Sequence, residues 1–395
     1  MTERTAIRQL PLEYWLRVLG DFLTGFGRSM LIPFMLIFLK QAGGFPTWVA
    51  TLLTAVPQFL QLFSTSWGGV LADFYGRKPV MFLSLFGSGA ALSLMLSNNY
   101  LVVYLGYVAF LVVSNFYRPA AFAMVTDVVP LELHRDAFAI LRTSANLGFA
   151  LGPLVGGVLF FSHRPVVISG TILAYFLTAC TVFLMRETIS PAAKDPGVEQ
   201  GSNQRGGSAA VAGFKLQNPL GSLKLLTRDI LLLWTVITGV LFLMVQLQMF
   251  SSFTVVVNDQ FGDAGQTLSY LLLINTAGVV VGQYFVTSYT RNLSFFTLMK
   301  LAIFAAGLGW GMLLLPMGAT RFYLTMVFTT LGEMLMAAGY NPFIAGLAKE
   351  GEVAQYMSFS QTSSILGQMF GPTLGAMGYD LGGQTGFVLV LWLLT

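Results

Sequence analysis

The chain has 395 residues, of which 55% are hydrophobic and only 10% charged, and its mean hydropathy is +0.72. Charged residues make up about 25% of soluble globular domains, so this composition excludes an ordinary soluble domain and predicts an integral membrane protein. The net charge of +4 comes from lysines and arginines in loops between apolar segments, so it does not indicate a nucleic-acid-binding surface.

Apolar segments long enough to cross a bilayer recur along almost the whole chain. A membrane-spanning helix needs about 20 apolar residues, because its backbone must satisfy its own hydrogen bonds in lipid. The sequence predicts twelve such helices, at about 14–39, 46–72, 79–98, 100–126, 138–162, 165–186, 229–257, 264–290, 295–317, 321–348, 355–379 and 384 onward. In the last one only Gly386 to Thr395 is clearly apolar, so we expect the chain to stop inside its final helix. The predicted fold is all-α.

Positive residues are divided unequally between the two sets of loops. If the N-terminus lies inside, most lysines and arginines fall in cytoplasmic loops, as the positive-inside rule requires. The outer loops then hold few of them, namely Lys40, Arg164 and Arg321. We therefore expect a multi-pass protein of the inner or plasma membrane, in contact with membrane lipids, with a cytoplasmic N-terminus.

The first predicted span contains charged residues on one helix face. Asp21 and Arg28 are seven residues apart, and Arg17 precedes Asp21 by one turn. A permanent internal salt bridge and a working role, in which Asp21 exchanges arginine partners, are equally consistent with this spacing. Arg118 in the fourth span precedes Pro119, which frees a carbonyl and loosens the local helix.

The turn between the second and third spans reads GVLADFYGRKP and combines glycines with charges at a membrane surface. Its key residues are Gly69, Asp73, Gly76, Arg77 and Lys78. The glycines let two helices approach closely, and the charges can grip helix ends or pair with acids. We expect Asp127 and Asp136 to be the partners in this half. Anchoring by the positive-inside rule alone would explain Arg77 and Lys78, but it would not explain Asp73 between Gly69 and Gly76. The pattern therefore favours a cytoplasmic gate.

The fifth span carries a glycine-proline pattern that reappears in the eleventh. Its residues are Gly148, Gly152, Pro153, Gly156 and Gly157, and the second copy has Gly367, Gly371, Pro372 and Gly375. Small residues four apart form helix packing faces. Matching landmarks in two halves are also typical of transporters whose halves rock about a site near the membrane midplane.

A polar stretch separates the two halves. Residues 187–228 are rich in glycine and serine, as flexible linkers are. The predicted organisation is therefore a six-helix bundle at 1–186, a cytoplasmic linker at 187–228 and a second six-helix bundle at 229–395. The end of the linker, Pro219 to Arg228, reads equally well as plain linker or as a short interfacial helix.

Glu333 lies near the middle of the tenth span, where an ionised side chain costs about 2.5–3.5 kcal/mol on insertion scales. A group retained at that cost needs a partner, water or a function. We interpret Glu333 as a proton-binding carboxylate that also attracts cationic substrate. The alternative is a carboxylate permanently hydrogen-bonded between helices.

Four amide side chains also fall near mid-depth in their spans. They are Gln58, Gln246, Asn275 and Gln368. Each taken alone is best explained as an interhelical hydrogen bond. Together they predict a moderately polar central cavity whose remaining walls are apolar.

Two motifs make the chain resemble the major facilitator superfamily along its length, and more closely the twelve-span drug:proton antiporter branch. GVLADFYGRKP resembles the family's loop G-x-L-A-D-R-x-G-R-K, with Phe74 in place of the arginine. GFALGPLVGG resembles the helix-five motif G-x-x-x-G-P-x-x-G-G associated with antiporters. The resemblance implies two pseudo-symmetric bundles, alternating access and protons as the coupling ion.

The chain also departs from the family pattern. The family's helix-four arginine would fall near 108–110, where no arginine occurs, and Arg118 lies nearer the cytoplasm as a displaced candidate. The counterpart of the gate loop in the second half, around Gly282 to Asn292, is degenerate. The resemblance therefore implies that gating charge is concentrated in the first half.

The sequence lacks the motifs of an ATP-driven transporter or of a membrane enzyme. No lysine is followed by serine or threonine, so a Walker-type phosphate loop is absent, and the two histidines fall in loops on opposite sides. We expect no enzyme activity, no metal site, no cofactor and a monomer.

The resulting hypothesis is a secondary transporter that exports amphipathic small molecules, neutral or cationic, in exchange for protons. Its coupling and substrate residues would be Glu333, Asp21, Arg28 and Arg118. The alternatives are a uniporter or symporter for a metabolite and a lipid translocator of the same fold. A receptor or scaffold is disfavoured, because a bundle without transport would gain stability by losing its buried acids.

Overall fold

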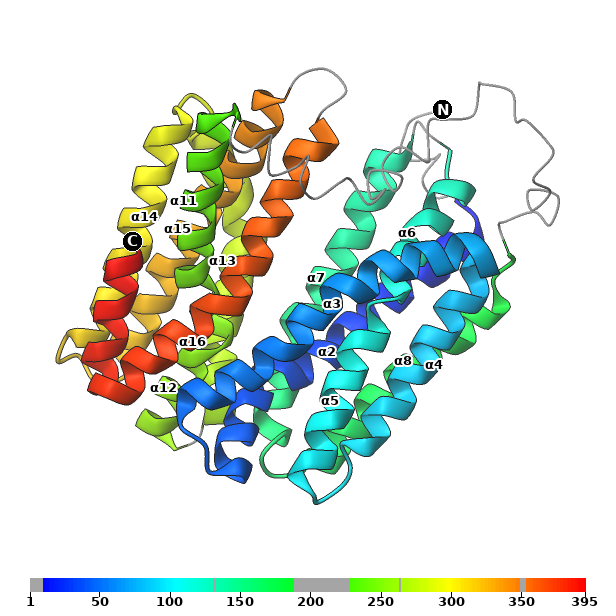
Figure 1. Cartoon of the computed structure of the whole chain (residues 1–395), viewed down its shortest axis with the longest axis horizontal. Helices are drawn as coiled ribbons and strands as arrows, with labels where there is room; N and C mark the ends of the chain where they lie inside the picture. The colour runs from blue at the N-terminus through cyan, green and yellow to red at the C-terminus, as the bar shows by residue number, and fades with distance from the viewer. Residues whose placement is uncertain (1–9, 131–132, 188–227, 263, 349–352) are drawn as a thin grey trace. The chain divides into compact units, whose positions relative to one another are not determined.

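A computed structural model describes residues 10–130, 133–187, 228–262, 264–348 and 353–395 (Figure 1). Within these ranges the chain is helical and contains no strand. Eight helical stretches of the described residues are long and apolar enough to cross a membrane. The other predicted spans, 46–72, 79–98, 355–379 and 384 onward, are also largely helical. The all-α prediction is confirmed.

Within each half of the chain, few residues separate one helix from the next. The first half contains α2 (Leu12–Gly43), α3 (Thr47–Tyr75), α4 (Arg77–Leu94), α5 (Tyr100–Ser114), α6 (Tyr117–Val128), α7 (His134–Leu159) and α8 (Arg164–Leu184). The second half contains α11 (Ile230–Gln246), α12 (Ser252–Phe261), α13 (Ala264–Tyr289), α14 (Phe295–Gly311), α15 (Thr320–Leu347) and α16 (Val353–Leu394), with short 3₁₀ turns at Leu247–Phe250 and Met312–Leu314.

Two predicted spans are interrupted in the structure. The fourth, expected as one helix over 100–126, breaks at Asn115 and Phe116 between α5 and α6. Pro119 explains this break, because a proline ring clashes with the carbonyl four residues earlier, here that of Asn115. The seventh, expected over 229–257, passes through a 3₁₀ turn between α11 and α12. Interrupted helices inside membranes are tolerated where they border protein or a water-filled cavity.

The eleventh and twelfth spans share one label, α16, because they meet without a loop. The backbone turns at Gly382 and Gly383, and Gly383 has φ 58° and ψ −145°. Residues with a Cβ rarely adopt such a backbone conformation, so this position favours glycine.

The contacts divide the chain into two compact units. Unit 1 comprises residues 1–32 and 59–215, and unit 2 comprises 33–58 and 216–395. The sequence places 33–58 in the first bundle, whereas the contacts place it in the second unit. Most of the predicted linker, 188–227, lies outside the described residues.

Polar contacts explain why the segment 33–58 joins unit 2. Asp259 of α12 accepts hydrogen bonds from Lys40 Nζ at 2.8 Å and from the Tyr379 hydroxyl at 3.1 Å. Asp380 accepts one from the backbone N–H of Trp48 at 2.9 Å, in the first turn of α3. A carboxylate at a helix N-terminus is favoured by the unpaired N–H groups there.

Helices α2 and α3 therefore run continuously from one unit into the other. Each contains one proline, and these prolines lie beside the unit boundaries: Pro33 begins the unit 2 part of α2, and Pro57 lies next to Gln58, the last residue of that segment. A proline removes one hydrogen bond from the helix and favours a kink.

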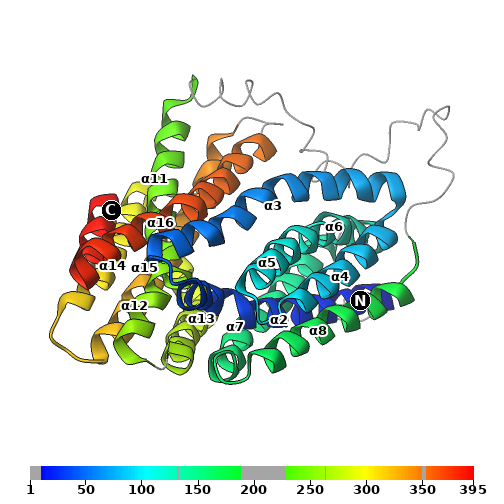
Figure 2. The ribbon, with the colours of Figure 1, turned by 60° about the horizontal axis from the view of Figure 1, so that its bottom comes forward.

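Packing inside each unit is helix on helix. In unit 1, α4 packs against α5, α6 and α8, and these helices lie side by side in Figure 2. In unit 2, α15 packs against α13 and α14, and α11 packs along α16. The unit 2 core includes the buried aromatic residues Phe242, Tyr340, Tyr356 and Phe359.

Candidate functional site

Glu333 lies at the midpoint of α15, and two amides from neighbouring helices hold its carboxylate. Asn275 Nδ2 of α13 donates to Glu333 Oε2 at 2.8 Å, and Gln246 Nε2 at the end of α11 donates to the same oxygen at 3.3 Å. Asn275 Nδ2 also lies 3.1 Å from Thr330 Oγ1, one turn before Glu333. The described residues include no salt bridge to Glu333.

Both amide donors meet one oxygen of the carboxylate, and this asymmetry has a chemical consequence. Oε2 is occupied by two N–H groups, while Oε1 receives no hydrogen bond from the described residues. Gln246 Oε1 is also buried without a hydrogen-bond partner there. The arrangement stabilises a carboxylate through neutral donors and leaves one carboxyl oxygen for a proton or another ligand.

Three of the predicted polar residues thus come together, and two do not join them. Gln246, Asn275 and Glu333 form one cluster, here called the Glu333 cluster. Gln58 on α3 and Gln368 on α16 are both half-buried, and neither hydrogen-bonds to Glu333. Of the four amides, Gln246 and Asn275 therefore contact this carboxylate, and the central cavity stays a prediction.

In unit 1 the charged residues on one face of α2 do not pair as Asp21 with Arg28. Asp21 forms its salt bridge with Arg17, four residues earlier, and not with Arg28. Arg17 is 4% exposed, and its guanidinium also lies over the Tyr117 ring at 4.8 Å from the centroid. Asp21 is therefore the counter-ion of a buried arginine.

Arg28 and Arg118 have no acidic partner among the described residues. Arg28 Nη2 donates to Gln61 Oε1 at 3.2 Å, and Gln61 also accepts at its backbone oxygen from Asn115 Nδ2 at 3.0 Å. Arg118 lies over the Phe122 ring at 5.6 Å from the centroid. The helix interruption at Asn115 thus lies beside both arginines.

The turn between α3 and α4 is built on a glycine and capped by an acid. Gly76 has φ 104°, a conformation that favours glycine, and a Cβ there would lie 2.6 Å from Glu187 Oε2. Glu187 accepts from the backbone N–H groups of Arg77 and Lys78, each at 3.1 Å, and so caps the start of α4.

Arg77 joins this turn to the end of α6. Its Nε lies 2.7 Å from Asp127 Oδ2, as expected for one of the two predicted partners. Lys78 lies over the Phe183 ring at 5.2 Å. A Cβ at Gly69 of α3 would lie 4.0 Å from Pro119 Cβ, so α3 passes close to α6. The side chain of Asp73 lies outside the described part of the structure.

The glycines of the repeated motif let two helices touch backbone to backbone. A Cβ at Gly148 would overlap the Phe22 carbonyl, and one at Gly152 would overlap the Ser29 hydroxyl. Ser29 Oγ in turn donates to the Gly148 carbonyl at 3.3 Å. The rest of the motif, Pro153, Gly156 and Gly157, is buried inside α7.

Unit 2 repeats this packing with its own helices. A Cβ at Gly371 of α16 would lie 2.6 Å from Met244 Cα of α11. Gln248 Nε2 donates to the Gly371 carbonyl at 2.6 Å, and Ser252 Oγ donates to the Pro372 carbonyl at 2.6 Å. In both units the motif therefore joins the fifth helix to the first through close backbones and polar side chains.

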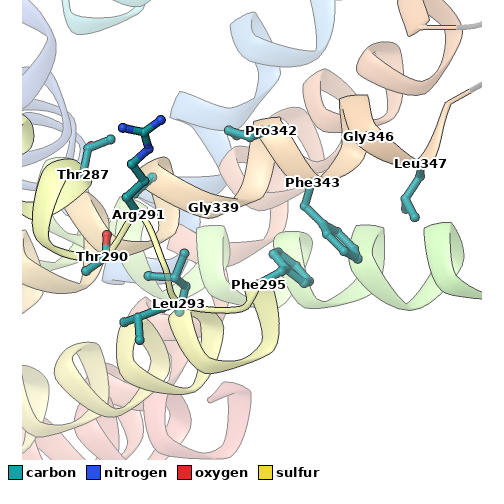
Figure 3. Close-up of a pocket in the computed structure, with 12 residues that line it drawn as sticks. Thr287, Thr290, Arg291, Leu293, Phe295, Gly339, Pro342, Phe343, Gly346 and Leu347 are labelled. Carbon is teal, nitrogen blue, oxygen red and sulfur yellow. The ribbon is translucent and has the colours of Figure 1, made fainter.

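The counterpart of the Gly76 turn in unit 2 has no equivalent ion pair within the described residues. The turn between α13 and α14 borders a cavity of about 440 Å³ (Figure 3). Phe295 and Phe343, which both line it, stack on each other with ring centroids 3.8 Å apart, and Arg291 is another lining residue. This cavity shares none of the residues of the Glu333 cluster, although it is lined in part by Ala338 and Gly339, which follow Glu333 on α15.

Sequence reasoning missed three residues that shape these sites. Glu187, Gln61 and Gln248 accept or donate the hydrogen bonds described above. Gln61 and Gln248 are polar residues within apolar spans, and this pattern in the sequence could have marked them as hydrogen-bonding residues. Glu187 lies at the start of the polar stretch, where an acid carries no distinguishing signal.

Comparison with known proteins places this geometry in a family. Residues 18–372 match the model of the Major Facilitator Superfamily. A Na⁺, Li⁺, K⁺/H⁺ antiporter of Planococcus maritimus is 26% identical over 90% of this chain and 87% of that protein. The multi-drug resistance efflux pump PmrA of Streptococcus pneumoniae is 30% identical over 45% of this chain and 46% of the pump.

The same fold occurs in solved transporters. A crystal structure of the peptide transporter POT in complex with sulfate covers 100% of this chain and 97% of its own, with a TM-score of 0.74 and 14% identity. The family match spans both units and both copies of the glycine-proline motif up to Pro372. The chain belongs to the major facilitator superfamily of multi-pass membrane transport proteins.

Proposed function

We propose that this protein is a proton-coupled secondary transporter that moves amphipathic small molecules out of the cell by alternating access. The observation that carries the proposal is Glu333 at the midpoint of α15, held by neutral amides and without an ionic partner in the described residues. A membrane-embedded ionisable side chain with no permanent counter-ion is a candidate for a proton relay. Relatives named as a cation/H⁺ antiporter and a multidrug efflux pump support the same class of function.

The geometry gives Glu333 a way to gain and lose a proton. The ionised carboxylate accepts from Asn275 and Gln246 at Oε2, and a proton can occupy Oε1 without displacing either amide. One charge moving through a membrane potential of 100 mV releases about 2.3 kcal/mol, which is enough to drive a modest gradient of substrate. Gly76, Arg77 and Asp127 would close the cytoplasmic side, in a plasma membrane with the N-terminus inside.

A second candidate is the exchange of monovalent cations for protons. The Planococcus maritimus antiporter matches 90% of this chain, twice the share matched by the drug pump. Glu333 Oε1 and the buried Gln246 Oε1 are oxygens of the kind that alkali cations bind, and Gln246 Oε1 has no other partner among the described residues. In this reading the proton and the cation would compete for one carboxylate.

The test is Glu333→Gln in proteoliposomes that report internal pH. The amide keeps the size and much of the hydrogen bonding of the side chain but cannot carry a proton. We expect substrate-evoked or Na⁺-evoked proton movement to fall to the level of protein-free liposomes. Glu13→Gln, in the first turn of α2, is the matched control and should behave as the wild type.

The assay separates the two candidates by what evokes proton movement. A response to lipophilic drugs in the absence of alkali cations supports drug exchange, and a response to Na⁺ or K⁺ alone supports cation exchange. Unchanged gradient-driven proton movement in Glu333→Gln would sink the coupling role and leave the carboxylate with a structural one.

A further inference from the structure

Unit 1 carries an excess of positive charge inside its membrane-spanning helices. Arg17 and Arg28 lie on α2, and Gln61 connects Arg28 to Asn115, three residues before Arg118, through one hydrogen bond to each. The one acid in this group is Asp21, and the salt bridge to Arg17 occupies it. Among the described residues, two guanidinium charges are therefore left without a negative partner.

The two remaining arginines are held in place by neutral groups. Arg28 donates to the Gln61 amide oxygen at 3.2 Å. Arg118 makes a cation–π contact with Phe122. These contacts orient the guanidinium groups but cannot cancel their charge.

The depth of Arg118 in its span favours a position that faces water. It lies ten residues before the end of α6, about 15 Å by the helical rise, and its side chain is exposed in the structure. An arginine exposed to hydrocarbon at that depth is costly, so such residues face a bundle interior or a water-filled cavity. Next to it the chain breaks at Asn115, and interrupted helices border binding sites in transporters.

We propose that Arg28 and Arg118 form a binding subsite for an anionic oxyacid group, carboxylate or phosphate, on an amphipathic ligand. Two guanidinium groups present donors in the planar geometry that matches such oxyanions. The proposal rests on the proposed transport function and changes one part of it: the ligand carries a negative group, whereas the sequence favours neutral or cationic molecules. The apolar body would lie against aromatic residues such as Phe122.

The experiment measures binding to the purified full chain in nanodiscs, without any ion gradient. Three acid and amide pairs serve as probes: benzoate and benzamide, 1-naphthylacetate and 1-naphthylacetamide, decanoate and decanamide. We expect the acid of at least one pair to bind about tenfold more tightly than its amide, the gain typical of a charge-assisted hydrogen bond. Arg118→Gln and Arg28→Gln should each reduce this ratio to about one.

Two further variants separate charge from folding. Arg118→Lys retains the positive charge but not the planar donors, and should keep part of the preference for the acid. Arg291→Gln removes an arginine of unit 2 that lines the cavity in Figure 3 and should leave the ratio unchanged. Equal binding of acid and amide in all three pairs, or a preference that survives both glutamine variants, overturns the proposal.

The lipid composition of the nanodisc distinguishes the two sources of such a group. If phosphatidylglycerol competes with the acids in the wild type, but not in Arg118→Gln, the subsite takes a phospholipid headgroup. If it does not compete, the subsite takes a water-soluble organic anion. Because no proton gradient is present, this result is independent of whether Glu333→Gln abolishes coupling.

Discussion

Unit 1 holds its membrane-embedded acid against an arginine, whereas unit 2 holds its acid against two amides. Asp21 neutralises Arg17, which is almost completely buried. Glu333 is held by Gln246 and Asn275, which carry no charge. An acid that neutralises a buried cation cannot take up a proton without leaving that cation uncompensated, while an acid held by amides can. The comparison favours a structural role for Asp21 and makes Glu333 the candidate for the proposed proton coupling.

The first and largest effect should come from removing Asp21. Asp21→Asn leaves the Arg17 guanidinium buried without a counter-ion, and breaking a buried ion pair costs about 3–5 kcal/mol. We expect a large loss of thermal stability in detergent, measured by the unfolding midpoint. The double variant Arg17→Met with Asp21→Asn should recover most of it.

Glu333→Gln provides the contrast on the other side of the comparison. It creates no uncompensated charge, so its midpoint should stay close to that of the wild type. Equal stability losses in Asp21→Asn and Glu333→Gln would mean that both acids are structural, and the comparison between the units would collapse.

A smaller effect, equal in the two units, is expected from the repeated glycines. Gly148→Val and Gly371→Val each push a side chain into the backbone of the first helix of the unit, against Phe22 and Met244. Overpacking of this kind costs about 1–3 kcal/mol. Thermal unfolding of both variants measures this loss of stability. Gly170→Val is the control, because a Cβ at Gly170 would have no neighbour within 4 Å.

A result confined to one unit would be informative. If Gly148→Val is tolerated and Gly371→Val is not, the motif packs tightly in unit 2 only, and the repeat would not carry the same packing role in both halves.

The smallest effect on stability should come from the two corresponding turns, between α3 and α4 in unit 1 and between α13 and α14 in unit 2. Asp127→Asn removes the partly buried ion pair with Arg77 and should cost about 1 kcal/mol. Arg291→Gln, at the corresponding turn of unit 2, should cost close to nothing, because no ion pair to Arg291 is found among the described residues. Raising the salt concentration should shrink the Asp127→Asn effect, which thermal unfolding at low and high salt tests.

Much of this fold could be predicted from the sequence because lipid limits the choices. The spans follow from apolar length, and the break at Gly382 and Gly383 falls where the sequence predicts the boundary of the last two spans. The interruption at Asn115 was missed, although Pro119 contained the signal, because proline is often tolerated in membrane helices.

The sequence identifies the polar and charged residues of the site, but it does not predict which of them contact one another. Glu333 could be identified from its depth alone, but its amide partners come from helices 58 and 87 residues away in the chain. Asp21 has arginines at both i−4 and i+7, and spacing could not decide between them. The assignment of 33–58 to unit 2 depends on Asp259 and Asp380, which lie more than 200 residues away and have no local pattern that marks them.

Pro33 and Pro57 have a mechanical consequence. The chain passes between the units at three places, and two of these lie within continuous helices, each beside a proline. A helix that lacks one hydrogen bond bends more easily at that point than elsewhere along its length. Any change of shape that moves one unit against the other must flex these two short lengths of helix. The bending stiffness of α2 and α3 at Pro33 and Pro57 therefore resists any such movement.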